Sequence, residues 1–395
     1  MATYLFAWEL GFGLGHLVNL KPLVAGLHQR GHTVALAIRD LTRAWTFFPH
    51  DRVTLWQAPF KNRTTQRKFP TLSFAHVLYD AGFCDPVELQ GHGEAWRNLY
   101  RAVDPDVIVF DHSPTALLAA RGFRAKRVTL GTGFFCPLDV SPLPTLQPWL
   151  KPDPVQLAHD EQEVLNNANA VLAAWSEPPL GHLAGLYHPS DEHLLVTFAE
   201  LDHYGGRAGA HYWGAWSTGF GKPPEWPAAP GKKIYAYLKP FPELSALLGA
   251  LHRAACPTIV YCDGIAADVQ NQFRSPTLRF ENEPLDMTRV GRKCDLAILN
   301  ANHGTAVQIL LAGKPSLQIP IYVEQSLLAG AMMRMGAALG ASPAVAREIE
   351  VQLHRLISSD CCVEAARGFA DKYRNFEPER QITGIVDRLE ALGKA

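Results

Sequence analysis

The sequence predicts an α/β fold made of two doubly wound, Rossmann-like domains that face each other across a cleft. Three observations lead to this prediction. Short apolar runs alternate with helical segments, which is typical of a parallel sheet with helices on both faces. A stretch rich in glycine and proline, GFGKPPEWPAAPGKK at 219–233, interrupts the alternation. The alternation then restarts, and 395 residues are enough for two sizeable cores.

The first half opens with a predicted strand at 4–8, a glycine loop and a helix. That helix carries its leucines on one face, and Pro22 is expected in its first turn, because a proline further inside removes a hydrogen bond. Gly31 is expected to end the helix. The later predicted elements are strands at 33–38, 53–58, 107–110 and 127–130 and helices at 94–103 and 114–122.

The second half repeats the alternation. Residues from Pro343 onward are predicted to be helical to the end. The other predicted elements are strands at 234–238, 258–262, 296–299 and 316–319 and helices at 243–254, 304–312 and 325–335.

Composition limits the class of protein. The sequence contains 37 basic residues (Lys and Arg) and 38 acidic residues (Asp and Glu). We therefore expect no basic face that could bind nucleic acid. Charged residues make up 19% and hydrophobic residues 47%, which indicates a chain folded nearly throughout. The seven cysteines are scattered without a CxxC pair, which favours reduced thiols in the cytoplasm. We expect neither a signal peptide nor a transmembrane segment.

The glycine loop Gly11, Gly13, Gly15 ends in His16. An imidazole placed directly after a strand lies at the carboxyl edge of the sheet, where α/β folds bind ligands. We interpret His16 as a general base, the alternative being a helix cap. Asp111 follows the strand at 107–110 and emerges at the same edge, so we expect it to orient the imidazole, to cap the next helix, or to do both.

The same loop also resembles the dinucleotide fingerprint GxGxxG. Asp40 follows the second predicted strand at a plausible spacing. However, His16 stands where the third glycine belongs, so an NAD-dependent oxidoreductase is the alternative hypothesis.

A second motif, NANHGTAVQILLAGKPSLQIPIYVEQ, covers residues 300–325. A helix that begins near Gly304 exposes N–H groups suited to phosphate, and Thr305 adds a hydroxyl. Glu324 and Gln325 open the following helix. They suit hydrogen bonds to sugar hydroxyls, although polar residues in a first helical turn are also common.

Together the motifs resemble those of nucleotide-sugar glycosyltransferases. The order GxGH, small-residue loop, helix, GKP, strand ending in IP and EQ looks like the UDP-glycosyltransferase superfamily with the GT-B fold, including its bacterial macrolide branch. The second half is also similar to the lipid-linked peptidoglycan N-acetylglucosaminyltransferase. The resemblance implies an acceptor-binding domain at 1–220, a linker at 221–233, a nucleotide-sugar-binding domain at 234–375, and a helix at 376–395 that crosses back.

The resemblance also implies roles for individual residues. His16 matches the catalytic base and Asp111 its partner. Gly304 and Thr305 match the diphosphate-binding helix start, and Glu324 with Gln325 matches the pair that holds the donor sugar. The full expected donor-binding set is Gly13, Gly15, Lys239, Asn300, Asn302, His303, Gly304, Thr305, Gln308, Glu324 and Gln325.

The chain departs from the family pattern at two places. Asn300 and Gln308 stand where the family has a histidine and a ribose-binding glutamate, and His303 is expected to point elsewhere. The first strand of the second domain ends in Lys239-Pro240 instead of Gly-Ser or Gly-Thr. Our hypothesis is that Lys239 supplies the positive charge that Asn300 lacks; the alternative is a solvated loop lysine. The departures also admit a noncatalytic partner protein.

The expected reaction is inverting, metal-independent transfer from a UDP- or dTDP-linked sugar to a small apolar or aromatic acceptor, with no cofactor. We expect no metal site and no nucleic-acid partner, and the oligomeric state is left open. A basic stretch of Lys61, Arg63, Arg67 and Lys68 would give weak contact with a membrane surface, or would simply be solvated. Aromatic residues of the first half would line the acceptor site or pack in its core: Trp45, Phe47, Phe48, Trp56, Phe60, Phe69, Phe74, Tyr79, Phe83, Phe134 and Phe135.

Overall fold

The computed structural model describes residues 1–11, 13, 15–48, 53–61, 70–217, 221–262 and 264–394. The chain divides into two compact units. Unit 1 consists of Met1–Phe198, Arg207–Gly214 and Glu379–Ala395, and unit 2 consists of Ala199–Gly206 and Ala215–Pro378.

The unit boundaries differ from those expected between residues 199 and 233. The segment 199–206 groups with unit 2, where Glu200 Oε2 accepts a hydrogen bond of 2.7 Å from the Tyr373 hydroxyl. The expected linker also packs on unit 2, because the Lys222 ammonium lies 2.6 Å from Glu281 Oε2. Residues 219 and 220, which precede it in the glycine- and proline-rich stretch, lie outside the described residues.

Unit 1 is built on a parallel sheet. Among the described residues it has six strands in the order β3-β2-β1-β4-β5-β6. This order reverses direction between β1 and β4, the point at which doubly wound sheets bind their ligands. The strands are β1 (Thr3–Trp8), β2 (Thr33–Ile38), β3 (Thr54–Gln57), β4 (Val107–Asp111), β5 (Lys126–Gly131) and β6 (Glu192–Leu195).

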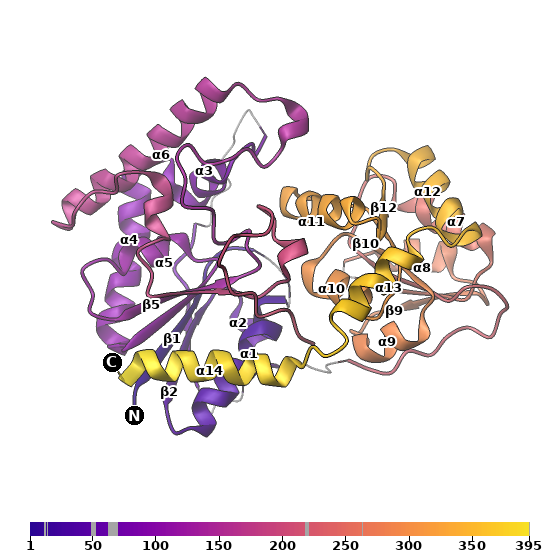
Figure 1. The fold of residues 1–395 in the computed structure, drawn as a ribbon, viewed down its shortest axis with the longest axis horizontal. Helices are drawn as coiled ribbons and strands as arrows, with labels where there is room; N and C mark the ends of the chain where they lie inside the picture. The colour runs from indigo at the N-terminus through magenta and orange to yellow at the C-terminus, as the bar shows by residue number, and fades with distance from the viewer. Residues whose placement is uncertain are drawn as a thin grey trace. The chain divides into compact units, whose positions relative to one another are not determined.

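Helices cover both faces of this sheet (Figure 1), with α4 and α5 on one side and α1 and α14 on the other. Four short 3-10 or π turns are labelled η among the described residues. The elements are α1 (Gly15–Gln29), α2 (Leu41–Ala44), α3 (Phe74–Leu78), η1 (Tyr79–Phe83), α4 (Pro86–Val103), α5 (Pro114–Ala119), η2 (Pro148–Leu150), α6 (Pro154–Ala174), η3 (Leu183–Leu186), η4 (Ala199–Leu201, in unit 2) and α14 (Pro378–Lys394).

Helix α1 corrects one expectation. Pro22 lies inside the helix rather than in its first turn, because the helix begins as early as Gly15. A proline there cannot donate to the Val18 carbonyl four residues earlier. The helix persists because its other face, including Leu20 and Leu23, is completely buried, and burial of such side chains outweighs one lost hydrogen bond.

Helix α14 packs on unit 1. Arg30 Nη2 lies 2.6 Å from Asp387 Oδ1, and Arg30 Nη1 lies 2.8 Å from Glu390 Oε2. The Tyr4 hydroxyl donates to the Leu389 carbonyl at 3.1 Å. These contacts tie the end of the chain to β1 and α1.

Unit 2 contains a second parallel sheet. Within the described part of the chain it has six strands in the order β12-β11-β10-β7-β8-β9. They are β7 (Ile234–Leu238), β8 (Thr258–Cys262), β9 (Leu278–Glu281), β10 (Leu296–Leu299), β11 (Ser316–Gln318) and β12 (Ala338–Gly340). The helices are α7 (Leu244–Ala254), α8 (Ala267–Phe273), α9 (Met287–Lys293), α10 (His303–Leu311), α11 (Val323–Arg334), α12 (Ala346–Ser358) and α13 (Val363–Lys372).

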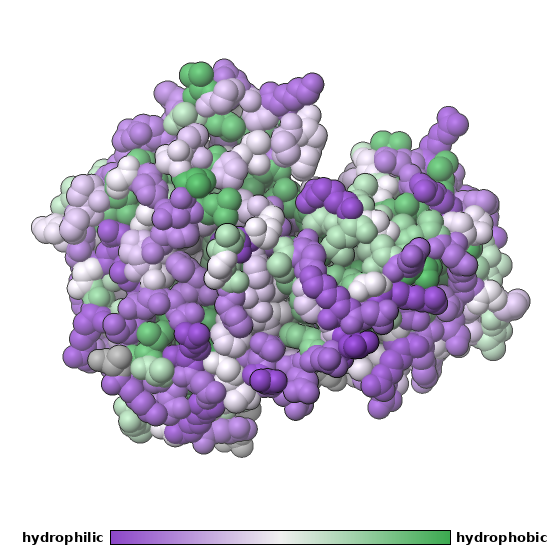
Figure 2. All heavy atoms as spheres, viewed as in Figure 1, coloured by the Kyte–Doolittle hydropathy of each residue, from purple (hydrophilic) through white to green (hydrophobic). Residues whose placement is uncertain are grey.

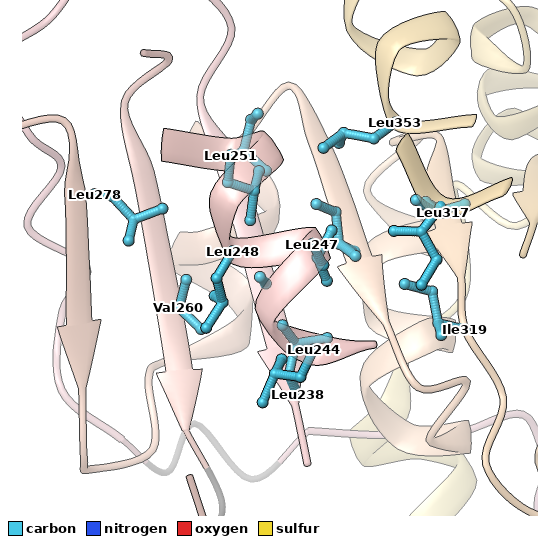
Figure 3. Close-up of a cluster of buried hydrophobic side chains, with 14 of the residues drawn as sticks. Leu238, Leu244, Leu247, Leu248, Leu251, Val260, Leu278, Leu317, Ile319 and Leu353 are labelled. Atoms are coloured by element: carbon cyan, nitrogen blue, oxygen red, sulfur yellow. The ribbon is translucent and has the colours of Figure 1, made fainter. Parts of the chain in front are cut away.

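The core of unit 2 lies where α7 packs on the sheet (Figure 3). Leu244, Leu247, Leu248 and Leu251 recur at helical spacing and are all buried. They meet side chains of the sheet such as Val260. This packing holds the strand ends that carry the second motif.

The surface is mixed in character. In the view of Figure 2, hydrophilic residues predominate and hydrophobic residues occur in scattered patches. Among the described residues, no helix is long and apolar enough to cross a membrane.

Candidate active-site residues in each unit

His16 and Asp111 are hydrogen-bonded in unit 1. His16 Nδ1 lies 2.9 Å from Asp111 Oδ2. The two meet because Trp8 and Asp111 are opposite residues in the last pair of β1 and β4, and α1 starts directly after the glycine loop. The side chains are 11% and 2% exposed, so the pair is largely shielded from water. A carboxylate at this distance can orient the imidazole.

Gly11 fits closely against the His16 ring. Its φ of 87° favours glycine, and a Cβ at this position would lie 2.6 Å from His16 Nε2. Gly13 also has a positive φ, of 98°, but a Cβ there would meet no described atom within 4 Å. A side chain at position 11 would therefore meet the His16 ring, whereas one at position 13 would not.

The turn after Asp111 is held by two hydrogen bonds. Ser113 Oγ donates to the Ala7 carbonyl at 2.8 Å, and the Leu10 amide donates to the His112 carbonyl at 3.0 Å. His112 has a φ of 48°, which is unfavourable for a residue with a Cβ. Such backbone strain persists only where the surroundings impose it, and it is common at functional sites.

Glu9 is a buried carboxylate at the end of β1. Its Oε2 accepts from the amides of Thr115 and Ala116 at 3.0 and 3.3 Å, in the first turn of α5. Burial raises the pKa of Glu9 to about 7, against the opposing effect of these hydrogen bonds. Glu9, rather than Asp111, thus supplies a side-chain cap for α5.

In unit 2 the start of α10 lacks a side-chain cap of its own. Asn302 occupies the N-cap position, but no side-chain hydrogen bond caps the helix there. Its Oδ1 instead accepts from Gln325 Nε2 at 2.9 Å. Gly304 is exposed, and a Cβ there would meet no described atom within 4 Å, while Thr305 is half-buried. This helix start matches the surroundings of an anion site.

Asn300 is bonded within the protein. It is 0% exposed, its Oδ1 accepts from the Lys239 amide at 2.7 Å, and its Nδ2 donates to the Ile319 carbonyl at 2.9 Å. This amide joins the ends of β7, β10 and β11, and its expected place in the donor-binding set stays a prediction. The Lys239 side chain is half-buried, and its expected charge contribution stays a prediction.

Gln325 is likewise used by the protein itself. Its Oε1 accepts from the amides of Ile321 and Tyr322 at 2.7 and 3.2 Å. Since its Nε2 donates to Asn302, both of its polar atoms have protein partners. Its expected contact with sugar stays a prediction. The adjacent Glu324 is half-buried and stays a candidate for that contact, as does the half-buried Gln308 for the nucleoside.

His303 is the first residue of α10 and stacks on His203, with ring centroids 6.3 Å apart and planes at 29°. Burial, with a smaller effect of His203, lowers the pKa of His303 to about 3. His303 is therefore neutral at ordinary pH and adds no positive charge at this helix start.

Other expected residues fall into three groups. Phe47, Phe48, Phe74, Phe83, Phe134 and Phe135 are buried, as the packing alternative predicts, whereas Trp45 and Trp56 are 43% and 38% exposed. The Lys61 side chain is only 7% exposed and lies 2.8 Å from Glu88 Oε2, so it offers little charge to a membrane. Arg63, Arg67, Lys68 and Phe69 lie outside the described residues.

The sequence motifs assigned no functional role to Trp8, Glu9 and His112 in unit 1 or to His203 in unit 2. Trp8 was expected only as the last residue of a buried strand. A charged residue directly after a buried strand was the signal available for Glu9.

Solved structures of glycosyltransferases share this fold. The calicheamicin glycosyltransferase CalG4 is 17% identical, with a TM-score of 0.70 over 99% of this chain and 98% of that chain. Glycosyltransferase VinC in complex with dTDP is 14% identical, with a TM-score of 0.66 over 99% of both chains. Spinosyn rhamnosyltransferase SpnG with thymidine diphosphate is 15% identical, with a TM-score of 0.63 over 97% of this chain and 99% of that chain.

No protein-family model matches the chain, and no curated protein sequence matches it. Likeness at such low identity establishes the fold. The predicted pair of doubly wound α/β domains is thus confirmed as the GT-B type of these glycosyltransferases.

Proposed function

We propose that this protein is an inverting glycosyltransferase that moves a sugar from a nucleoside-diphosphate sugar to a hydroxyl of a small acceptor. The observation that carries the proposal is the 2.9 Å contact between His16 Nδ1 and Asp111 Oδ2, at the point where the unit 1 sheet reverses direction. Solved structures with this fold are sugar transferases, which supports the same chemistry.

In the proposed reaction His16 acts as the general base. With Asp111 ionised, Nδ1 carries the proton of the neutral ring and the basic lone pair lies on Nε2. Nε2 takes the acceptor's hydroxyl proton while the oxygen attacks the anomeric carbon. The bond from that carbon to the diphosphate oxygen breaks, and attack from the opposite side inverts the centre. Asp111 stabilises the imidazolium that forms, and the sugar passes through an oxocarbenium-like transition state.

The leaving diphosphate would bind at the start of α10. The helix dipole is positive there, and the amides of Gly304 and Thr305 can donate to phosphate oxygens. We propose Lys239 as an additional positive charge, since His303 is neutral. The proposal needs no divalent metal, so transfer is expected to continue in excess EDTA.

We propose a dTDP- or UDP-linked sugar as the donor. The structures of VinC and SpnG contain dTDP and thymidine diphosphate, respectively. For the acceptor we retain a small apolar or aromatic alcohol or phenol, recognised by unit 1.

The proposal is tested first by ligand binding and then by turnover. Thermal unfolding with dTDP, UDP, GDP and NAD should show stabilisation by dTDP or UDP; a ligand at 100 times its Kd contributes about 2.7 kcal/mol. Release of nucleoside diphosphate from the donor, with an acceptor panel present, should be lost in His16→Gln while donor binding persists. A His16→Gln enzyme with full transfer activity would refute the base assignment.

Two variants of one residue test the phosphate site. Gly304→Ala adds a methyl group where no described atom lies within 4 Å, so it should leave binding intact. Gly304→Asp puts a carboxylate at the same helix start and should weaken dTDP or UDP binding at least tenfold by charge repulsion. Equal affinity in both variants would place the diphosphate elsewhere.

The alternatives differ from the proposal in their ligands. For an oxidoreductase, Asp40 would bind a ribose, but its Oδ1 accepts from the Thr42 and Arg43 amides at 3.1 and 3.3 Å and caps α2. Stabilisation by NAD alone would nevertheless favour that class. A chain that binds no nucleotide at all would instead support a noncatalytic partner protein.

A further inference from the structure

Several protein groups adjoin the His16 ring, whose side chain is 11% exposed. Asp111 and Gly11 adjoin its two nitrogens. Trp8 stacks on the ring, with centroids 4.8 Å apart and planes at 22°. Phe135 is a second aromatic neighbour. Its ring is tilted against the His16 ring, with centroids 5.5 Å apart and planes at 31°.

These rings are themselves fixed in place. Trp8 is 1% exposed, and its Nε1 donates to the Leu10 carbonyl at 2.6 Å. Phe135 packs on the end of β5, since a Cβ at Gly131 would lie 2.6 Å from Phe135 Cδ2. The His112 ring also stacks on Phe135, with ring centroids 4.2 Å apart and planes at 20°. The two imidazoles are thus neighbours beside one phenyl ring.

We propose that Trp8 and Phe135 are positioning residues for the base, whose aromatic faces hold the His16 imidazole in place and stabilise its cationic form. The face of an aromatic ring is electronegative, so it attracts a cation lying over it, most strongly for tryptophan and more weakly for phenylalanine. In water-poor surroundings this attraction is less screened. The mechanistic value of the effect rests on the proposed function, in which His16 becomes an imidazolium.

Other charged groups near His16 do not provide the same effect. Asp111 on β4 stabilises the cation through Nδ1, in the plane of the ring. Burial, and then His16 and Arg39, hold the pKa of His112 well below its usual value, so His112 stays neutral. Burial raises the pKa of Glu9 to about 7, so Glu9 also titrates near neutral pH. The test is therefore made in a Glu9→Gln background as well as in the native chain.

The experiment follows the protonation of His16 directly. The full-length protein carries ¹³C-labelled histidine, its NMR spectra are recorded from pH 4 to 9, and His16→Gln assigns the signal. Trp8→Phe keeps an aromatic face but loses the hydrogen bond to Leu10, whereas Trp8→Leu loses both. Trp96→Phe is the matched control, because Trp96 is also completely buried and its ring lies beside Tyr100.

The expected result is a graded change. Trp8→Leu should reduce the protonation constant of His16 about threefold, and Trp8→Phe should reduce it by less. Phe135→Leu should cause a smaller reduction than Trp8→Leu because its ring lies further away. Trp96→Phe should leave the constant unchanged. If Trp8→Leu does not fold, Trp8→Phe and Phe135→Leu decide the outcome.

Two results would overturn the inference. One is an unchanged His16 titration in folded Trp8 and Phe135 variants. The other is an equal shift in Trp8→Phe and Trp8→Leu, which would assign the effect to the Leu10 hydrogen bond. Because the titration needs no donor or acceptor, it can succeed even if the chain transfers no sugar. If the chain does transfer sugar, the acidic limb of the kcat/KM profile should move with the NMR midpoint.

Discussion

The substitution Gly11→Ala tests whether the glycine loop exists to position the base. The added methyl carbon would lie 2.6 Å from His16 Nε2, whereas ordinary contacts begin near 3.4 Å. The imidazole must therefore move by most of an ångström, or the loop must open. A misplacement of this size costs roughly 100-fold in rate when it affects a catalytic group.

Gly13→Ala is the matched control. Both glycines have a positive φ, 87° and 98°, so both variants carry a similar backbone penalty of about 1–2 kcal/mol. Only the methyl group at position 11 would meet the His16 ring. A difference between the variants thus reports the displacement of the base rather than general strain.

The assay compares kcat/KM for transfer and the affinity for dTDP or UDP in both variants. Gly11→Ala should lose about 100-fold in kcat/KM relative to Gly13→Ala, with little difference in nucleotide affinity, because the proposed function assigns the nucleotide to unit 2. Equal rates in the two variants would refute the argument that the close approach of Gly11 positions His16.

Three further predictions concern stability. Burial penalises the ionised form of Glu9 and raises its pKa from 4.5 to about 7, so about 3 kcal/mol of the free energy of unfolding should be lost as pH rises from about 4.5 to 7; Glu9→Gln should remove most of this loss in urea titrations at pH 5 and 8. Asn300→Ala leaves two buried backbone groups without partners and should cost about 3 kcal/mol in the same assay. Leu248→Ala should cost about 2–5 kcal/mol, whereas Val351→Ala, at a side chain that is 54% exposed, should cost little.

The strands that the sequence located best are those inside the sheets. The bounds of β2, β7, β8 and β10 match the predicted ranges, because strands buried on both faces give continuous apolar runs. The edge strand β9, Leu278–Glu281, was not predicted, because Arg279 and Glu281 interrupt its apolar pattern. Edge strands make fewer contacts, so their sequences carry a weaker signal.

The contacts of His16 likewise include one that the sequence predicts and one that it does not. The pairing of His16 with Asp111 was predictable, because both follow neighbouring parallel strands and must emerge at one edge. The position of Phe135 beside His16 was not, because it depends on the path of the chain after β5 and on the space left by Gly131. Contacts of this kind arise from tertiary packing and leave no periodic pattern in the sequence.

In the proposed function Asn300 stands where the family that the chain resembles has a histidine, so the expected positive charge is assigned to Lys239. In the sheet, β10 lies beside β7, and Asn300 Oδ1 accepts from the Lys239 amide at 2.7 Å. The amide at position 300 therefore fixes the backbone of the lysine where β7 ends, so a charge missing from one strand end can be supplied from its neighbour. On this argument Lys239→Gln should weaken dTDP or UDP binding about tenfold, and Lys239→Arg should largely preserve it. Calorimetry with all three proteins measures this, and an unchanged Kd in Lys239→Gln would show that the lysine is an ordinary loop residue.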